Sequence, residues 1–194
     1  MLIEAMIISL IIGLIRGGKL KRFKTLNHKT IWFLIFGILT QYILVFLNKA
    51  GAIGSLNKIL FYTKEILIIS YILILIGLFT NLKFKSLWLS LIGFILNFFV
   101  LISNNWKIPI LMEGIPLINS PNLKELLEKG NTYLYTPIME GTKYPVLGDI
   151  IVFSKPYPIP KIISFGDLLI GFSIFLLIQE IMLSEDSFMG GYRL

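Results

Sequence analysis

The chain has 194 residues, of which 56% are hydrophobic and 15% are charged, and its formal net charge is +7. This composition excludes an ordinary soluble domain, because too little polar surface would remain to cover the apolar core. The chain has no cysteine, which excludes a disulfide framework and a thiol nucleophile.

Five apolar stretches, each nearly free of charge, are predicted to be membrane-spanning helices: residues 2–15, 31–47, 66–80, 87–103 and 168–183. With their edge residues they approach the roughly 20 residues that a helix needs to cross about 30 Å of hydrocarbon. The sequence therefore predicts an all-α integral membrane protein with about five transmembrane helices. We expect residues 1–194 to form a single membrane domain.

Basic residues gather in the loop between the first two predicted spans: Arg16, Lys19, Lys21, Arg22, Lys24 and Lys29. Positively charged short loops are typical of the cytoplasmic side, so we expect the N-terminus to lie outside and the C-terminus in the cytoplasm of a bacterial cell. The basic cluster beside the membrane favours anionic membrane lipid as a partner and argues against nucleic acid. The first stretch is read as a retained helix, because its basic cluster follows the apolar run.

The segment 104–163 contains all eight prolines of the chain, so it cannot be one continuous helix. We expect it to form a proline-rich extracytoplasmic cap between spans four and five. Ser120, Pro121 and Gly130 predict one short helix, whose three leucines share one face. We expect this helix to lie along the membrane surface. Residues 131–136 and 150–153 favour extended structure.

Small and amide residues recur at the spacing i, i+4 and i+11 in two spans: Gly37, Gln41 and Asn48 in the second, and Gly93, Asn97 and Asn104 in the fourth. This spacing places them within about 20° of one helical face. They could join helices in the bundle or support a site. Asn104, nearer the outer surface, could equally cap a helix end.

Two Gly-Asp steps, Gly148-Asp149 and Gly166-Asp167, flank a proline-rich turn at the predicted outer membrane boundary. Two carboxylates held a few Å apart cannot both ionise easily, so one keeps a proton and the pair can supply a base and an acid for metal-free hydrolysis. In the alternative reading, Ser164 or Asp167 caps the last span and Asp149 is an ordinary loop carboxylate.

Short ordered motifs at 96–97, 103–104, 108–109, 147–151 and 163–169, followed by Gly171, resemble an uncharacterised bacterial family of small multi-span membrane proteins, known only as a domain of unknown function. The resemblance covers essentially the whole chain. It implies no activity.

A more remote resemblance is to lipoprotein signal peptidase, a four-span aspartyl protease of the plasma membrane. Asp149 and Asp167 would match its two catalytic aspartates, residues 48–52 its outer-loop motif, and Gly93 with Asn97 the end of its third span. The chain departs from that family in three ways. It has no Asp-Arg pair after Asn97, and it has Ile53 where the family has phenylalanine. Roughly fifty residues separate Asn97 from Asp149, where the family has a short link.

Whether the chain is an enzyme stays open. The most specific hypothesis is an Asp-dyad hydrolase of a membrane-anchored or lipid-linked peptide, with Asp149 and Asp167 catalytic and supporting roles for four further residues: Asn97, Asn104, Gly148 and Gly166. The alternative is a non-enzymatic membrane module that binds a lipid or protein partner through the cap. A small transporter is disfavoured, because no inverted repeat is visible. We expect no cofactor and no metal, since His28, the only histidine, has no acidic neighbour.

Overall fold

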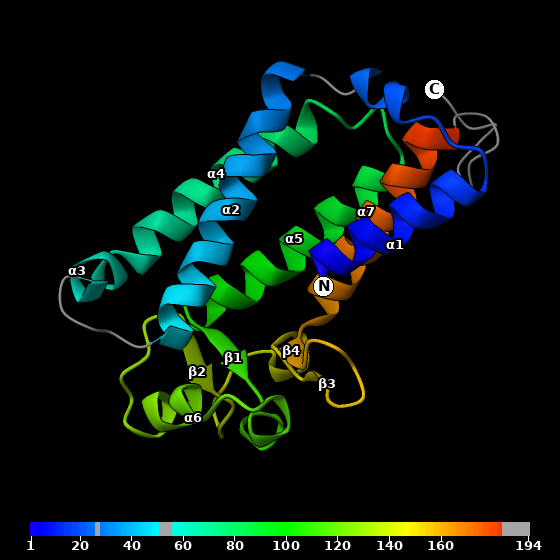
Figure 1. The fold of residues 1–194 in the computed structure, drawn as a ribbon. Helices are drawn as coiled ribbons and strands as arrows, with labels where there is room; N and C mark the ends of the chain where they lie inside the picture. The colour runs from blue at the N-terminus through cyan, green and yellow to red at the C-terminus, as the bar shows by residue number, and fades with distance from the viewer. Residues whose placement is uncertain (26–27, 51–55, 184–194) are drawn as a thin grey trace. The chain divides into compact units, whose positions relative to one another are not determined.

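The computed structural model describes residues 1–25, 28–50 and 56–183, which are mostly helical. The helices are α1 (Leu2–Ile15), α2 (His28–Ala50), α3 (Leu56–Phe61), α4 (Thr63–Phe79), α5 (Ser86–Ser103), α6 (Pro121–Glu128) and α7 (Phe165–Leu183). The short 3-10 helices are η1 (Leu20–Thr25), η2 (Met112–Gly114), η3 (Pro116–Ile118) and η4 (Pro145–Leu147). The strands are β1 (Ile108–Ile110), β2 (Tyr135–Pro137), β3 (Ile151–Phe153) and β4 (Lys161–Ile163) (Figure 1).

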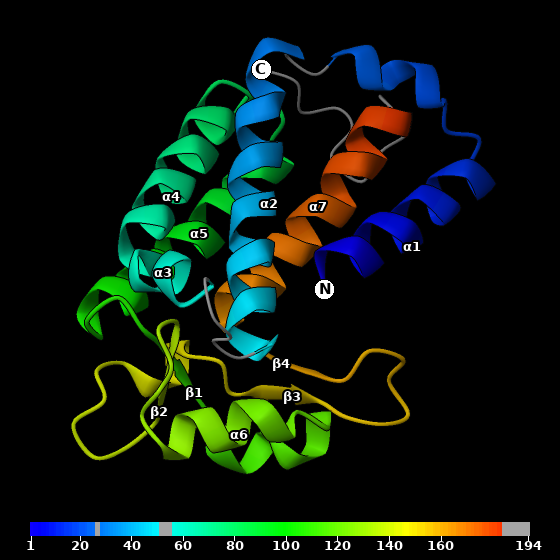
Figure 2. The same cartoon turned by 60° about the vertical axis from the view of Figure 1, so that its left-hand side comes forward.

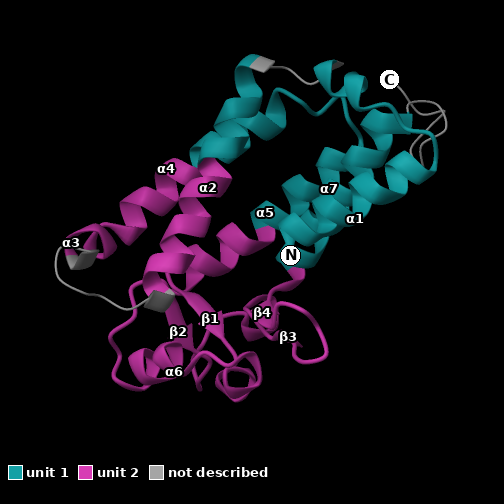
Figure 3. Ribbon diagram, in the orientation of Figure 1, with its two compact units in different colours: residues 1–36, 72–95, 166–194 teal, residues 37–71, 96–165 magenta. Residues whose placement is uncertain are grey.

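The chain divides into two compact units, coloured separately in Figure 3. Unit 1 comprises Met1–Phe36, Ile72–Ile95 and Gly166–Leu194. Unit 2 comprises Gly37–Tyr71 and Leu96–Phe165, and so contains the proline-rich segment. Because α2, α4 and α5 each contribute to both units, the division runs across the helices rather than between them.

The predicted apolar stretches all appear as helices. Among the residues that the structure describes, three helices are long and apolar enough to cross a membrane: Lys29–Asn48, Ser86–Ser103 and Phe165–Leu183. The other two apolar helices that match predicted spans, α1 and α4, are shorter. At about 1.5 Å per residue, the 14 residues of α1 span about 21 Å and the 17 residues of α4 about 26 Å.

Large apolar side chains cover the outside of these helices. In α1, Ile7 is 52% exposed and Ile11 is 53% exposed, and in α2 Phe46 is 70% exposed. Of the apolar segment of α2, only 17% is buried within the protein, whereas 56% of the apolar segment of α7 is buried. Many exposed large apolar side chains on a helix are typical of contact with lipid or with another protein.

Unit 1 is built on close contacts at glycines. A Cβ on Gly93 of α5 would lie 2.6 Å from the carbonyl oxygen of Gly166 of α7, and a Cβ on Gly77 would lie 2.4 Å from Leu34. Small residues let helix backbones approach this closely, as is common between membrane helices. The positions of Gly93 and Gly166 therefore fix where α5 and α7 meet.

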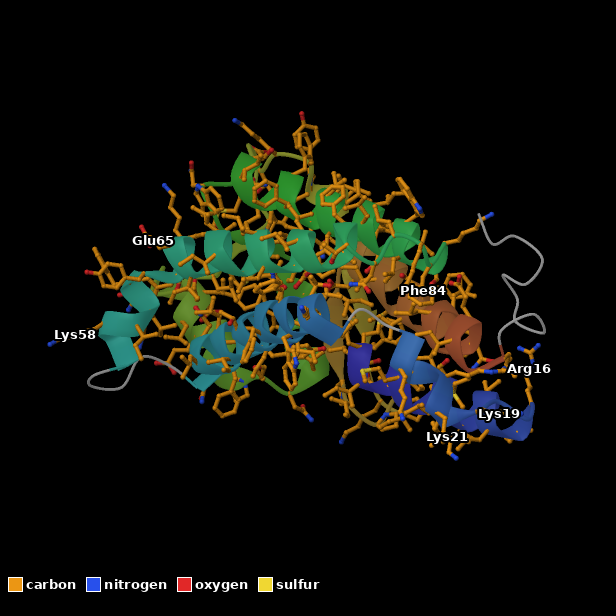
Figure 4. All side chains as sticks on the ribbon, turned by 90° about the horizontal axis from the view of Figure 1, so that it is seen from above. Arg16, Lys19, Lys21, Lys58, Glu65 and Phe84 are labelled. Carbon is orange, nitrogen blue, oxygen red and sulfur yellow. The ribbon has the colours of Figure 1, made fainter. Side chains whose placement is uncertain are left out.

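The basic loop of unit 1 is anchored to the end of α7. The backbone N–H of Lys19 donates to the carbonyl oxygen of Met182 at 3.0 Å, and the Arg22 guanidinium donates to the same oxygen at 2.8 Å. Figure 4 shows Arg16, Lys19 and Lys21 gathered at this end of the unit. Orphan carbonyls at a helix C-terminus commonly take such cationic partners.

Unit 2 contains two small sheets that sequence patterns do not reveal in full. β1 pairs with β2 in parallel, with Ile108 opposite Tyr135, and β3 pairs with β4 in antiparallel fashion, with Ile151 opposite Ile163. In Figures 1 and 2, β1 and β2 lie between α6 and the end of α2. The extended residues predicted at 131–136 include the first two residues of β2, and those predicted at 150–153 include all of β3. Neither β1 nor β4 is predicted from the sequence.

The predicted short helix is present as α6, with Pro121 in its first turn. Its apolar side packs within the protein, because Leu123 is 0% exposed and Leu127 is 4% exposed. Its place along the membrane surface stays a prediction. An amphipathic helix buries its apolar stripe wherever an apolar surface is available, and here the cap supplies that surface.

Truncation of Leu123 tests whether α6 packs on a protein core. Leu123→Ala should lower the free energy of unfolding by about 2–5 kcal/mol, because it opens a cavity in a closed core. Thermal unfolding of the detergent-solubilised protein measures the effect. Leu126→Ala, at a half-buried position of the same helix, is the matched control and should lower the free energy of unfolding clearly less. Equal and small effects of the two substitutions would show that α6 does not pack on a protein core.

Candidate functional site at the outer cap

Asp149 is fixed by its backbone alongside β1. Its N–H donates to the carbonyl oxygen of Pro109 at 2.8 Å, and its carbonyl oxygen accepts the N–H of Leu111 at 2.9 Å. Asp149 also forms a parallel bridge with Ile110 and is only 8% exposed. An acidic residue is thus held in one position inside unit 2.

Gly148 explains how Asp149 comes so close to β1. A Cβ at position 148 would lie 2.6 Å from the carbonyl oxygen of Pro109, a distance that real Cβ atoms essentially never show. Gly148 therefore has a steric role, and any larger residue would push Asp149 out of its bridge. A supporting role of Gly148 in a site stays a prediction.

Asp167 lies in the first turn of α7, where a carboxylate is stabilised by the free N–H groups and the dipole of the helix. Gly166, beside it, is buried at the contact with Gly93. Asp149 belongs to unit 2 and Asp167 to unit 1. Their convergence into a dyad stays a prediction.

Three asparagines join helix ends to the outer segment, and we call Asn48, Asn97 and Asn104 the amide clamp. Asn104 makes the fullest contact, because its Nδ2 donates to the carbonyl oxygen of Lys143 at 2.9 Å while its Oδ1 accepts the N–H of Lys143 at 3.0 Å. The same Nδ2 also donates to the carbonyl oxygen of Val100 at 2.9 Å. The side chain thus pairs with Lys143 much as a neighbouring strand would.

The other two members act at separate points of the cap. Asn48, 3% exposed, accepts the N–H of Leu134 at 3.1 Å, directly before β2. Asn97 accepts the Ser164 hydroxyl at 2.8 Å, directly before α7. Gln41, which shares the spacing, instead donates to Ser70 at 3.2 Å and so joins α2 to α4. Gly51 and Ala52, which contribute to the peptidase resemblance, lie outside the described residues.

Aromatic rings reinforce the junction of α5 with the cap. Phe98 packs against Tyr71 at 4.9 Å and against Trp106 at 6.0 Å between ring centroids, and the Lys64 ammonium lies 5.5 Å from the Trp106 centroid. Trp106 and its neighbour Asn105 both adopt positive φ, at 63° and 55°. Such conformations are costly for non-glycine residues. The ring contacts and the hydrogen bond from the Trp106 N–H to the Leu101 carbonyl oxygen, at 2.9 Å, together stabilise the turn.

Two polar residues of α7 were overlooked by sequence reasoning. Glu180, 7% exposed, accepts the Ser86 hydroxyl at 2.7 Å and the N–H groups of Lys85 and Ser86 at 3.3 Å, and so caps α5. Gln179 donates to the carbonyl oxygen of Ser9 at 2.6 Å. The available signal was the adjacent Gln-Glu pair in an otherwise apolar run, since buried polar groups in such runs are partnered.

Within residues 1–25, 28–50 and 56–183, no group of three or more His, Asp or Glu side chains is arranged to hold a metal ion. The site is therefore described by its acids and amides alone.

Comparisons with known proteins identify a family whose function is unknown. Residues 25–179 match the sequence profile described as "Family of unknown function (DUF5317)". Searches of curated proteins and of solved structures each returned no significant match.

Removal of the Asn104 amide tests the clamp. Asn104→Ala should lower the free energy of unfolding by about 0.5–1.5 kcal/mol, because it removes the two exposed hydrogen bonds to the backbone of Lys143. Asn104→Asp, which keeps an acceptor but loses the amide donor, should fall between Ala and the natural residue. Thermal unfolding in detergent provides the measurement, and Asn122→Ala, on the exposed side of α6, is the control. The clamp would be contradicted by equal stability of the Asn104 and Asn122 variants.

Proposed function

The chain belongs to the DUF5317 family, whose function is unknown, and we propose that it is a multi-pass plasma-membrane protein whose outer cap, residues 104–163, is a fixed binding module for a lipid or protein partner. The observation that carries this proposal is the amide clamp. Asn48 of α2 bonds Leu134 inside the cap, and Asn104 bonds both Lys143 of the cap and Val100 of α5. Asn97 of α5 bonds Ser164, the residue that directly follows the cap. A segment fixed to helices in this way presents its surface in one arrangement, which lowers the entropic cost of binding.

The proposed topology has five crossings, with the N-terminus outside and the C-terminus in the cytoplasm. The lengths of α1 and α4 fall short of the hydrocarbon thickness, but local thinning of the bilayer and extension of basic side chains such as Arg16 accommodate short spans. The exposed basic residues of unit 1, among them Lys19 and Lys21, then face anionic lipid headgroups at the inner surface. The cap lies on the opposite side.

A binding role is favoured over catalysis because both Gly-Asp steps have structural explanations. Gly148 allows close packing on Pro109, and the backbone of Asp149 completes the pairing of β1. Asp167 occupies the first turn of α7, following Ser164 by three residues in the arrangement of a capping box. Neither acid requires a reaction to account for its place.

The second candidate is the Asp-dyad hydrolase, and the observation that favours it is the burial of Asp149. An acid that is 8% exposed and held by backbone bonds on both sides is positioned as catalysis requires. With Asp167 beside it, one carboxyl would keep its proton and act as the acid while the other activated water toward a membrane-anchored peptide. Asn97, Asn104 and Gly166 would then support the pair.

Complementation of a deletion strain separates the two candidates. We expect the Asp149→Asn and Asp167→Asn variants to correct the defect of the deletion strain. The double variant Asn48→Ala, Asn104→Ala should fail to correct it, although the protein reaches the membrane. Immunoblots of membrane fractions control for protein level. Loss of complementation in both aspartate variants, with normal protein level, would overturn the binding module in favour of the hydrolase.

Reporter fusions test the topology. A reporter that is active only in the cytoplasm should work when fused after Lys24 and after Lys83 and should be inactive after Gly130, since the basic loop is predicted to stay inside. An alkaline phosphatase series at the same positions should give the reverse pattern. Activity of the cytoplasmic reporter at Gly130 would invert the proposed orientation.

A further inference from the structure

The segment 138–147, which connects β2 to Gly148, carries an unusual concentration of exposed apolar side chains for a cap that has its own core. Met139 is 65% exposed, Tyr144 is 51% exposed and Val146 is 62% exposed. Elsewhere in the cap, Ile115 and Leu123 are both 0% exposed, and the exposed apolar residues Leu117, Tyr133 and Ile159 occur singly along the chain. We call residues 138–147 the apolar loop.

The apolar loop is seated against the outward face of α5. The Tyr144 ring packs on Phe99 at 4.7 Å between centroids, and Phe99 is itself 39% exposed. Ile102, three residues further along α5, is 43% exposed, whereas Val100 and Leu101 between them are buried. In the proposed topology the Phe99 and Ile102 face contacts lipid, so the surface of the apolar loop continues a lipid-facing surface.

The loop is held in shape by hydrogen bonds at both of its turns. The N–H of Met139 donates to the Thr142 hydroxyl at 2.9 Å, and the N–H of Thr142 donates to the carbonyl oxygen of Met139 at 3.1 Å. The N–H of Leu147 donates to the carbonyl oxygen of Tyr144 at 3.0 Å. Asn104 of α5 pairs with Lys143 between these turns, so the loop cannot turn its side chains away without breaking the clamp.

We propose that the apolar loop is inserted into the outer leaflet of the bilayer, with Met139 and Val146 among acyl chains and Tyr144 at the level of the headgroups. Tyrosine is enriched at membrane interfaces because its ring is apolar and its hydroxyl is polar. The exposed Lys143 ammonium beside it can reach lipid phosphate. The proposal rests on the proposed topology, and it names phospholipid as the partner of this face of the cap.

The absence of cysteine from the chain allows a direct depth measurement with single nitroxide labels. Cysteine is introduced singly at Met139 and Val146, and as controls at Leu117, Ile159 and Glu128. Leu117 and Ile159 are exposed apolar residues of the cap outside the loop, 54% and 59% exposed, and Glu128 lies on the exposed side of α6. Accessibility to oxygen and to a water-soluble nickel chelate is then measured in vesicles of phosphatidylethanolamine and phosphatidylglycerol.

Labels at Met139 and Val146 should favour oxygen and so report a position within the lipid, while the label at Glu128 should favour the nickel chelate. Equal accessibilities at Met139, Val146 and Glu128 would overturn the proposal. Shielding of Met139 and Val146 from both reagents would also overturn it, because protein rather than lipid would then cover the loop. Insertion of Leu117 and Ile159 to the same depth would contradict assignment of the contact to this loop.

A second labelling experiment tests the location of the cap outside the cell separately from the insertion of the apolar loop into the bilayer. A membrane-impermeant maleimide added to whole cells should label the cysteine at position 128, and absence of labelling would show that the cap is not outside. Adding Asn104→Ala to the Val146→Cys variant should shift that label toward water, because the bond to Lys143 holds the loop against α5. An unchanged depth would show that insertion does not depend on the clamp.

Discussion

The fold of unit 2 depends on hydrogen bonds between asparagine side chains of α2 and α5 and the segments that follow these helices. An unpaired backbone group costs most where it is buried, and the N–H of Leu134 is such a group. Asn104 satisfies both backbone groups of Lys143, and Asn48 satisfies the N–H of Leu134. Together with the packing of Trp106 on Phe98 and of Tyr144 on Phe99, these bonds fix the cap to α2 and α5.

The same solution recurs at the other end of the helices, with different residues. Glu180 of α7 accepts hydrogen bonds from the first residues of α5, and Gln179 pairs with Ser9 of α1. Ser173 donates to the carbonyl oxygen of Ser86 at 2.7 Å, which adds a further link between α5 and α7. Polar side chains in this family member therefore serve first to join helices, and a chemical role has to be shown in addition to that one.

Much of the helical framework could be predicted from the sequence, because long apolar runs leave few alternatives to helices. The bounds of α1 agree with the prediction, and Pro121 marked the start of α6. The face that α6 buries could not be predicted, because an apolar stripe has the same pattern whether it meets lipid or protein. The strands β1 and β4 have three residues each, too few for an alternating pattern to stand out. Of the candidate site, the amide spacing indicated Asn97 and Asn104 as residues with protein partners, whereas the pairing of Asp149 with β1 depends on contacts distant in sequence.

The central claim is that the amide clamp fixes the cap, and amide hydrogen exchange of the protein in lipid nanodiscs tests it most directly. The account predicts slow exchange at Leu134 and Lys143 in the natural protein. Asn48→Ala should then speed exchange chiefly around Leu134, and Asn104→Ala chiefly around Lys143, while the N–H of Asp149, which is bonded to Pro109, stays protected in both variants. Fast exchange at Leu134 and Lys143 in the natural protein, unchanged by either substitution, would contradict the account.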